Sequence, residues 1–328
     1  MSKQESIFFS VIIPVYNRPK EIDELLESLL LQTYKNFEVI IVEDGSKAEL
    51  RCDDIANSYA DRLNITYYFK ENSGQGFSRN YGFERANGDY YVVFDSDCII
   101  PAHYFEAAAK GIQENKLDAY GGPDAAHDSF TDIQKAISYS MTSFFTTGGI
   151  RGKKNHIGDF HPRSFNMGIS KAVFDKTQGY IIPFKGEDIE FSIRILKNGY
   201  KSGLIENAFV YHKRRTNFAQ FFKQLHFFGT ARINIFRFFK EELKLVHFFP
   251  MCFLLFVISI PVAGLIHPYL GAVGLGFLML FETLNIVDST IKNKSLKVGL
   301  LSGIAAFIQL TAYGIGFIKE SLIYLRKG

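Results

Sequence analysis

Three long apolar stretches in the last third of this 328-residue chain limit its possible folds more than any other feature of the sequence. They run over about 248–266, 269–288 and 298–318. Each approaches the roughly 20 residues that an α-helix needs to cross a bilayer. We therefore predict that residues 247–328 form a transmembrane region built from these three helices.

The charges around these stretches predict on which side of the membrane the rest of the chain lies. Lys292, Lys294 and Lys297 separate the second stretch from the third, and cytoplasmic loops are rich in lysine and arginine. Two crossings then leave the N-terminal part in the cytoplasm, whereas a third crossing places Arg326 and Lys327 outside, against the same rule. The N-terminus has no basic region followed by an apolar stretch, so we expect no signal peptide. These features predict a multi-pass protein of the plasma membrane or a cell inner membrane, with its N-terminal domain in the cytoplasm.

Residues 216–246 have a different pattern, which predicts an amphipathic segment in the membrane interface. Aromatic and aliphatic side chains recur there at helical spacing, among scattered lysines and arginines. A basic, aromatic-rich helix beside apolar spans is typical of a helix that lies in the interface plane. The alternative is an ordinary core helix. The apolar stripe consists of Phe218, Phe221, Phe222 and Leu225.

The overall composition argues against two classes of protein. A net charge of +3 is too small to suggest a nucleic-acid-binding protein. The cysteines have no CxxC spacing, so we expect reduced thiols and not a disulfide framework or a zinc site. They are Cys52, Cys98 and Cys252.

Residues 1–215 alternate strand and helix patterns, which predicts a Rossmann-like α/β domain with a mostly parallel sheet. Ligands of such domains bind beyond the carboxyl ends of the strands. A dinucleotide-binding enzyme is excluded, because Pro-Val-Tyr-Asn-Arg-Pro stands where GxGxxG would follow the first strand. The expected strands are residues 8–13, 37–42, 65–69 and 90–94, and the expected helices are residues 19–31, 78–86 and 187–198, with another around 55–59.

Asp95-Ser96-Asp97 follows the fourth predicted strand and has the clearest chemistry of the polar clusters at strand ends. Its carboxylates are hard oxygen ligands, which Mg²⁺ and Mn²⁺ prefer. A divalent ion there can act as a Lewis acid toward phosphate oxygens. Two further acids, Glu187 and Asp188, open a later predicted helix, where they either complement the helix dipole or provide a general base.

Four short motifs follow one another along the first part of the chain. They are Ser10-Val-Ile-Ile-Pro-Val-Tyr-Asn17, Val42-Glu-Asp-Gly-Ser46, Gly76-Phe-Ser-Arg-Asn-Tyr-Gly82 and Phe94-Asp-Ser-Asp97. In this order they resemble the donor-binding half of a family 2 glycosyltransferase, a family with the GT-A fold. The resemblance covers roughly residues 8–215 and implies an inverting, metal-dependent enzyme that uses a nucleotide-sugar donor.

The resemblance implies that the donor binds at these strand ends. Asp97 would ligate the metal, while Asp95 would face the ribose or the donor sugar, with Ser96 beside it. Asp44, preceded by the acidic Glu43, would contact the nucleobase and ribose. The other implied donor-binding residues are Pro14, Tyr16 and Asn17 in the base pocket and Arg79 near a helix N-terminus, where a guanidinium also suits phosphate.

The same resemblance assigns the catalytic and acceptor sides. Gly186-Glu-Asp188 is similar to the family's ED motif, which implies Asp188 as the catalytic base and Glu187 as the alternative. Asn166-Met-Gly168 resembles the acceptor-side loop. His212, in Val210-Tyr-His212, stands where a histidine in several GT-A enzymes completes the metal site or touches the diphosphate.

We therefore expect an inverting enzyme that moves one sugar from a UDP- or GDP-sugar to a membrane-associated, lipid-linked acceptor in cell-surface glycan assembly. A polyprenyl-phosphate sugar synthase is an alternative. A processive polysaccharide synthase is disfavoured, because the chain has no tryptophan for a QxxRW motif, and Gln220 and Gln224 lead into phenylalanines. A non-catalytic nucleotide-sugar-binding membrane protein is a further alternative, but it would not need a base at Asp188.

Overall fold

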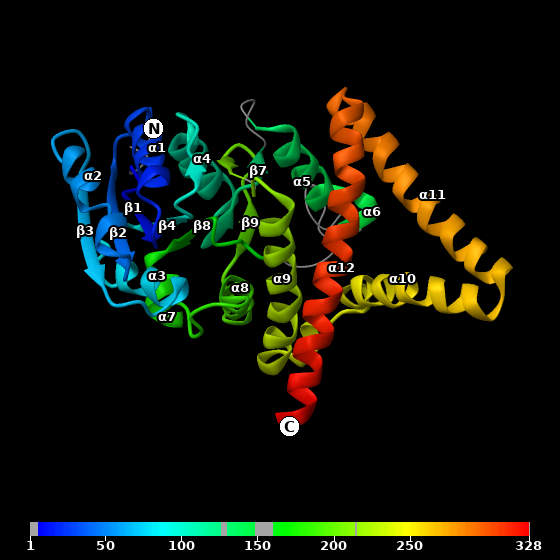
Figure 1. The fold of residues 1–328 in the computed structure, drawn as a ribbon. Coiled ribbons are helices and arrows are strands. Elements are labelled where there is room, and N and C mark those ends of the chain that lie inside the picture. Colours follow the sequence, from blue (N-terminus) through cyan, green and yellow to red (C-terminus); the bar gives the residue numbers. More distant parts are fainter. Residues whose placement is uncertain (1–5, 126–129, 148–159, 214, 328) are drawn as a thin grey trace. The chain divides into compact units, whose positions relative to one another are not determined.

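The computed structural model describes residues 6–125, 130–147, 160–213 and 215–327 (Figure 1). Clustering of contacts divides the chain into two compact units. The N-terminal unit contains the described parts of 1–127 and 157–212, and the helical unit contains the described parts of 128–156 and 213–328. All three candidate membrane helices belong to the helical unit.

A seven-stranded sheet of order β3-β2-β1-β4-β8-β6-β9 forms the centre of the N-terminal unit. The first four strands of this order run parallel, β8 is antiparallel to both β4 and β6, and β6 is parallel to β9. This confirms the predicted Rossmann-like α/β fold with a mostly parallel sheet. The strands are β1 (Phe9–Val15), β2 (Phe37–Asp44), β3 (Ile65–Lys70), β4 (Tyr90–Phe94), β6 (Ala119–Gly121), β8 (Asn166–Ser170) and β9 (Ser202–Leu204).

The sheet is covered on both faces because its central strands are apolar on both sides. In β1, Val11 and Ile13 enter one hydrophobic cluster and Ile12 enters the other, as the twofold alternation of a strand requires. Helices α1, α2 and α4 contribute to the first cluster, and α3, α7 and α8 contribute to the second. The helices of this unit are α1 (Pro19–Leu30), η1 (Ala48–Leu50), α2 (Asp53–Ser58), α3 (Gln75–Phe83), α4 (Tyr104–Asn115), α7 (Lys171–Thr177) and α8 (Glu187–Lys197).

The first strand does not end at Pro14, as its sequence suggested, but continues to Val15. Strand β4 pairs with β1 only as far as Ile12, so Pro14 lies where β1 has β2 alone as a neighbour. A proline is tolerated at such an edge because little or no ladder hydrogen bonding is lost there. The consequence is that β1 and β2 end together, and the polar residues after them lie at one edge of the sheet.

A second, three-stranded sheet brings the end of the N-terminal unit next to the end of β4. It has the order β5-β10-β7, with β10 antiparallel to β5 and parallel to β7. In this register His212 lies opposite Cys98. Its strands are β5 (Cys98–Ile99), β7 (Asp124–Ala125) and β10 (Val210–His212).

The helical unit contains three helices that are long and apolar enough to cross a membrane. They confirm the predicted apolar helices: α11 and α12 are longer than the sequence estimate, and α10 begins one residue later than estimated. The helices of this unit are α5 (Asp132–Thr142), α6 (Phe144–Thr147), α9 (Phe218–Phe238), η2 (Lys240–Glu242), η3 (Leu245–Phe248), α10 (Phe249–Ile266), α11 (Pro268–Asn293) and α12 (Leu296–Lys327).

The three candidate membrane helices differ in how much protein covers them. In the most apolar windows of the two spans that contain α10 and α11, 6% of the residues are buried, against 61% in that of α12. Helix α12 packs along α9, α5, α10 and α11, so much of its apolar surface faces protein. Among the described helices of this unit, α10 and α11 thus present the more exposed apolar surfaces.

The apolar stripe of α9 has a partner within the unit. Phe221 and Leu225 are buried in a cluster with Ala305 and Ala312 of α12, whereas Phe222 remains exposed. For Phe221 and Leu225, two of the four residues of the stripe, this packing agrees with the alternative that the segment is an ordinary core helix. A location of residues 216–246 in the membrane interface stays a prediction.

Two glycines allow α9 and α12 to pack closely. A Cβ placed on Gly316 would lie 2.1 Å from the carbonyl oxygen of His226, and one on Gly229 would lie 2.2 Å from that of Tyr313. Both obstacles are backbone atoms, which cannot rotate away as a side chain can. We therefore predict that Gly316→Ala separates the helices and lowers the free energy of unfolding by about 1–3 kcal/mol, as overpacking does.

Gly276→Ala in α11 is the matched control, because a Cβ there meets nothing within 4 Å. Alanine favours a helix over glycine, so this variant should be neutral or slightly more stable. Thermal unfolding of both variants in detergent tests the prediction. Equal melting temperatures would show that the helices can adjust to a methyl group at residue 316.

Candidate active site

A buried arginine joins three segments at the carboxyl edge of the sheet. Arg79 of α3 donates from Nη2 to Asp95 Oδ1 at 2.9 Å and from Nη1 to Glu187 Oε1 at 3.1 Å. Its side chain is 1% exposed. Gln75 also donates to Glu187. The predicted residues Arg79, Asp95 and Glu187 therefore meet, although they are far apart in the sequence.

The Asp97 carboxylate is bracketed by two basic side chains. His212 Nε2 lies 3.0 Å from Oδ1, and Arg18 Nη1 lies 2.6 Å from Oδ2. Burial works against the charged form of Asp97, but the charges and hydrogen bonds of His212 and Arg18 hold its pKa below the usual value. Asp97 is thus an anionic carboxylate with little solvent access. Ser96, between the two aspartates, is also buried.

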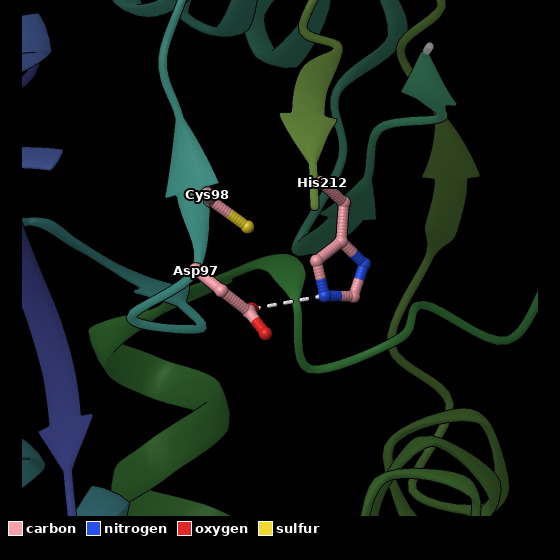
Figure 2. Close-up of side chains that lie close together, drawn as sticks. All are labelled: Asp97, Cys98 and His212. Carbon is pink, nitrogen blue, oxygen red and sulfur yellow. Dashed lines mark ion pairs between the residues drawn. The ribbon is translucent and has the colours of Figure 1, made fainter. Parts of the chain in front are cut away.

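The side chains around Asp97 fit a divalent cation. Single ligand atoms of Asp97, Cys98 and His212 lie within 4.8 Å of one another (Figure 2). Burial, reinforced by Asp97 and Asp95, raises the pKa of the Cys98 thiol well above its usual value, and this thiol contacts the Phe165 carbonyl. Without a bound metal this thiol is therefore protonated, and the two harder donors of the cluster are the Asp97 carboxylate oxygen and the His212 imidazole nitrogen. Such a set suits Mn²⁺ better than soft ions that select sulfur.

Pairing between β5 and β10 positions His212 for this contact. The register sets His212 opposite Cys98, one residue after Asp97. The imidazole also stacks on the Phe165 ring, with 5.1 Å between centroids and 17° between planes. The orientation of His212 is thus fixed by backbone pairing on one side and by an aromatic face on the other.

The two acids that open α8 have different surroundings. Glu187 is buried against Arg79 and Gln75, and burial together with the charge of Asp188 raises its pKa, while Arg79 opposes this. Asp188 is less enclosed and pairs through Oδ2 with Arg163 Nε at 2.8 Å. Of the two carboxylates, Asp188 is therefore the more exposed.

Asp44 ends β2 and is held by three donors, one from the last residue of β3 and two from the segment after it. Oδ1 accepts from Lys70 Nζ at 2.6 Å and from the Ser73 amide at 2.9 Å, and Oδ2 accepts from the Gly74 amide at 3.0 Å. Its neighbour Glu43 points into the core, where the Cys52 amide donates to it at 2.9 Å. Asp44 therefore fixes the loop before α3, and Glu43 fixes the segment before α2.

Tyr16 and Asn17 follow β1 at the same edge as Asp44. Asn17 adopts a left-handed backbone conformation, with φ +55°, and its amide donates to Ser46 Oγ at 2.7 Å. The Lys47 amide donates to its side chain at 3.0 Å. Tyr16 is exposed, whereas Pro14 lies within the strand. The four predicted base-pocket residues Pro14, Tyr16, Asn17 and Asp44 thus gather along two adjacent strand ends.

The predicted loop at Asn166 and Gly168 is wrong, because both residues lie in β8, paired with β4. Asn166 is fully buried, accepts from Tyr104 Oη at 2.5 Å and donates to the Ala208 carbonyl at 2.8 Å. A Cβ on Gly168 would lie 2.0 Å from the Tyr120 ring, so glycine leaves room for that aromatic side chain. These contacts explain both residues as parts of the core. Their acceptor-side role stays a prediction.

Sequence reasoning missed the cations that partner the predicted acids. They belong to loops or strand ends far from their partners in sequence, and a single basic residue there carries no motif. Arg18 could have been noticed because it directly follows the first motif. The missed residues are Arg18, Lys70 and Arg163.

Residues 10–176 match the sequence profile of a known family, described as "Glycosyl transferase family 2". This match covers just over half of the chain and includes the ends of β1, β2 and β4. The chain belongs to glycosyl transferase family 2. The family assignment confirms the prediction made from the four motifs, and the chain carries a family 2 glycosyltransferase domain.

Two relatives illustrate the range of similarity. A glycosyltransferase of Rickettsia conorii is 41% identical over 118 residues, which are 34% of this chain and 19% of the relative. The matches to five Rickettsia glycosyltransferases span only 12% to 32% of those proteins. A Methanococcus voltae protein is 26% identical over 95% of this chain and 98% of its own length. Its name is dolichyl N-acetyl-alpha-D-glucosaminyl phosphate 3-beta-D-2,3-diacetamido-2,3-dideoxy-beta-D-glucuronosyltransferase.

Solved structures support the GT-A fold. A mannosyltransferase from Pyrobaculum calidifontis, in complex with GDP-Man and Mn²⁺, superposes with a TM-score of 0.59 at 14% identity. The superposition covers 96% of this glycosyltransferase and 88% of the mannosyltransferase. TarS residues 1–349 from S. aureus, in complex with UDP-GlcNAc, give a TM-score of 0.50 at 22% identity, over 70% and 67% of the two chains. At these identities the likeness concerns the fold.

Arg79 offers a test of the charge network in this glycosyltransferase. Arg79→Met would leave the buried Glu187 and the half-buried Asp95 without their shared cation. Removing one partner of a buried ion pair costs about 3–5 kcal/mol. We predict a loss of that order in the free energy of unfolding, measured by thermal or chemical denaturation in detergent.

Arg85→Met, just after the same helix, serves as the comparison. Arg85 is partly exposed, pairs with the exposed Glu84, donates to the Tyr81 carbonyl at 2.8 Å and lies over the Tyr81 ring, so its loss should cost about 1–2 kcal/mol. Similar losses in the two variants would contradict a special role for the Arg79 network.

Proposed function

We propose that this glycosyltransferase is an inverting enzyme that transfers one sugar from a nucleotide-diphosphate sugar to a lipid-linked acceptor. The observation that carries the proposal is that the N-terminal unit holds both a candidate metal site and a separate carboxylate. Asp97, after β4, and His212, in β10, could bind a cation, and Asp188 offers the separate carboxylate at the start of α8. Arg79 ties the two segments together through Asp95 and Glu187.

The donor would lie along the carboxyl edge of the sheet, as ligands of doubly wound folds do. Tyr16, Asn17 and Asp44 line the ends of β1 and β2, where they suit a nucleoside. The diphosphate would lie nearer Asp97, where Arg18 and His212 supply basic groups. We assign the base-pocket role to Lys70 as well, because it extends from β3 to Asp44.

In the proposed reaction an acceptor hydroxyl attacks the anomeric carbon from the side opposite the diphosphate. Asp188 accepts the hydroxyl proton while the new carbon–oxygen bond forms, and the bond to the diphosphate breaks with its electron pair on the departing oxygen. Arg163, at 2.8 Å from Asp188, orients the carboxylate. A divalent ion held by Asp97 and His212 would stabilise the charge of the leaving group.

We propose Mn²⁺ over Mg²⁺ as the metal. The donor set pairs a carboxylate with an imidazole, and Mg²⁺ favours oxygen ligands alone. The Pyrobaculum mannosyltransferase, of the same fold, was crystallised with Mn²⁺, which agrees with this choice.

The lipid-linked acceptor is supported by the Methanococcus relative, which is named for a dolichyl phosphate-linked sugar acceptor and matches nearly the whole chain. That name favours a sugar hydroxyl over the lipid phosphate itself as the nucleophile. Lys292, Lys294 and Lys297, at the end of α11, in the connection and at the start of α12, support a cytoplasmic location of this turn and, by inference, of the catalytic domain of a multi-pass membrane protein.

With α10 and α11 as the two crossings, and α12 packed against protein on the cytoplasmic side, a groove on the helical unit has the chemistry to hold such a lipid. This open groove between α10 and α12 has a volume of about 490 Å³. Lys319 and Arg326 stand seven residues apart on α12, and among the described residues neither has a carboxylate partner within ion-pair distance. Two unneutralised cations beside an apolar surface complement a phosphate with an attached hydrocarbon chain. The lining residues are Leu254, Ile315, Ile318, Lys319, Leu322, Ile323 and Arg326.

The base assignment is tested by Asp188→Asn. This change keeps the size of the side chain but removes the proton acceptor, so we expect kcat to fall by about 10²–10⁴-fold while donor affinity is retained. Sugar transfer from a panel of UDP- and GDP-sugars to lipid-linked acceptors, with Mn²⁺ in detergent, measures it. Asp175→Asn, an exposed acid of α7, is the control and should leave kcat unchanged. An unchanged kcat in Asp188→Asn would exclude this residue as the base.

The groove is tested by Lys319→Gln. We expect the KM for a lipid-linked acceptor to rise by about tenfold or more, since a charge-assisted contact to phosphate contributes about 1.5–3 kcal/mol. Donor hydrolysis without acceptor should not change. Lys240→Gln, which removes an exposed cation outside the groove, is the control. An equal KM in wild type and Lys319→Gln would place the lipid elsewhere.

A further inference from the structure

Of the two basic side chains described above beside the candidate metal ligand Asp97, Arg18 makes the shorter contact. Its Nη1 lies 2.6 Å from Asp97 Oδ2, while His212 approaches the other carboxylate oxygen at 3.0 Å. The side chain of Arg18 is 34% exposed, against 8% for Asp97. A partly exposed guanidinium therefore covers one oxygen of a buried carboxylate that the metal needs.

The backbone at Arg18 is fixed although its side chain is long. Asn17, with φ +55°, is held by Ser46 and Lys47, and Pro19 begins α1 directly after Arg18. A proline at the first helical position has a preset φ and fits that turn without strain. The guanidinium can thus exchange partners by side-chain rotation alone, without movement of the sheet edge.

We propose that Arg18 stays paired with the Asp97 carboxylate until a nucleotide diphosphate binds, and then moves to the diphosphate. Binding of the metal at Asp97 therefore depends on the donor. The inference rests on the proposed function and concerns the order in which the metal and the donor bind. It makes Arg18 a positioning residue for the metal and a contact of the donor phosphates.

The physical basis is competition between cations for one anion. A divalent ion that binds Asp97 must either break the ion pair with the Arg18 guanidinium or lie close to its positive charge. Both effects weaken the binding of the metal without nucleotide. A diphosphate adds negative charge that can hold the metal and Arg18 together, because guanidinium groups bind phosphate oxygens well. Each ligand then strengthens the other, and the coupling must be the same in both directions.

If Arg18 has a purely structural role, its removal should not strengthen the binding of Mn²⁺. In that case the guanidinium keeps Asp97 in place for the metal, and its removal weakens or does not change metal binding. The two roles therefore differ in the sign of one measurement, the affinity for Mn²⁺ without nucleotide.

The experiment measures Mn²⁺ binding to the full chain in detergent by electron paramagnetic resonance, with and without UDP or GDP. We expect Arg18→Met to bind Mn²⁺ alone about tenfold more tightly than wild type, within the range of ordinary coupling between sites. The gain in Mn²⁺ affinity on adding the favoured nucleotide should be about tenfold smaller in Arg18→Met than in wild type. Arg18→Lys retains the charge and should lie between the two.

Lys20→Met is the matched control, since it removes an exposed cation two residues away that has no carboxylate partner within ion-pair distance among the described residues. It should behave as wild type, because exposed charges are screened over short distances. Equal or weaker Mn²⁺ binding by Arg18→Met without nucleotide would overturn the role of Arg18 and leave the proposed function intact. If no variant bound Mn²⁺ even with UDP or GDP, the proposed metal site itself would fail, and this inference with it.

Discussion

The fork of Arg79 between Asp95 and Glu187 is the contact on which the candidate active site depends. A guanidinium has donors in a fixed plane, so it can bond two carboxylates at once and set the distance between them. Here those carboxylates belong to the end of β4 and the start of α8, and Arg79 itself belongs to α3. The same contact neutralises acids that burial alone would leave unstable. The positions of Asp97, after β4, and of Asp188, in α8, therefore depend on the Arg79 side chain of α3.

The second constraint is the small sheet formed by β5, β10 and β7. It pairs the last residues of the N-terminal unit with the residues directly after Asp97. His212 thereby reaches Asp97 from 115 positions further along the chain, and Phe165 holds the imidazole ring on its other side. Backbone pairing is a suitable way to position such a ligand, because hydrogen bonds along two strands resist rotation of the residue.

Much of the fold could be predicted from sequence because its signals are local. The apolar run of β1 and the leucines of α1 show their periods within a few residues. The acids at residues 95, 97, 187 and 188 were found because they belong to short motifs at element ends. Strand β8 was missed, since Asn166 and Gly168 have poor strand propensity and adopt it only because Tyr104, Tyr120 and Ala208 surround them. Arg18 and Arg163 were missed because an ion pair across the fold leaves no pattern in the sequence around either partner.

The unequal lengths of α10 and α11 have a consequence for the membrane. At about 1.5 Å per residue, the 18 residues of α10 extend about 27 Å and the 26 residues of α11 about 39 Å, against a hydrocarbon core of about 30 Å. If these two connected helices cross the same bilayer, they cannot both match its thickness, and α11 would tilt or extend its last turns into water. Those turns carry the pair of Asp288 with Lys292, which suits an aqueous end. If the pair crosses a membrane, its shorter member limits the hydrocarbon thickness that both helices can match.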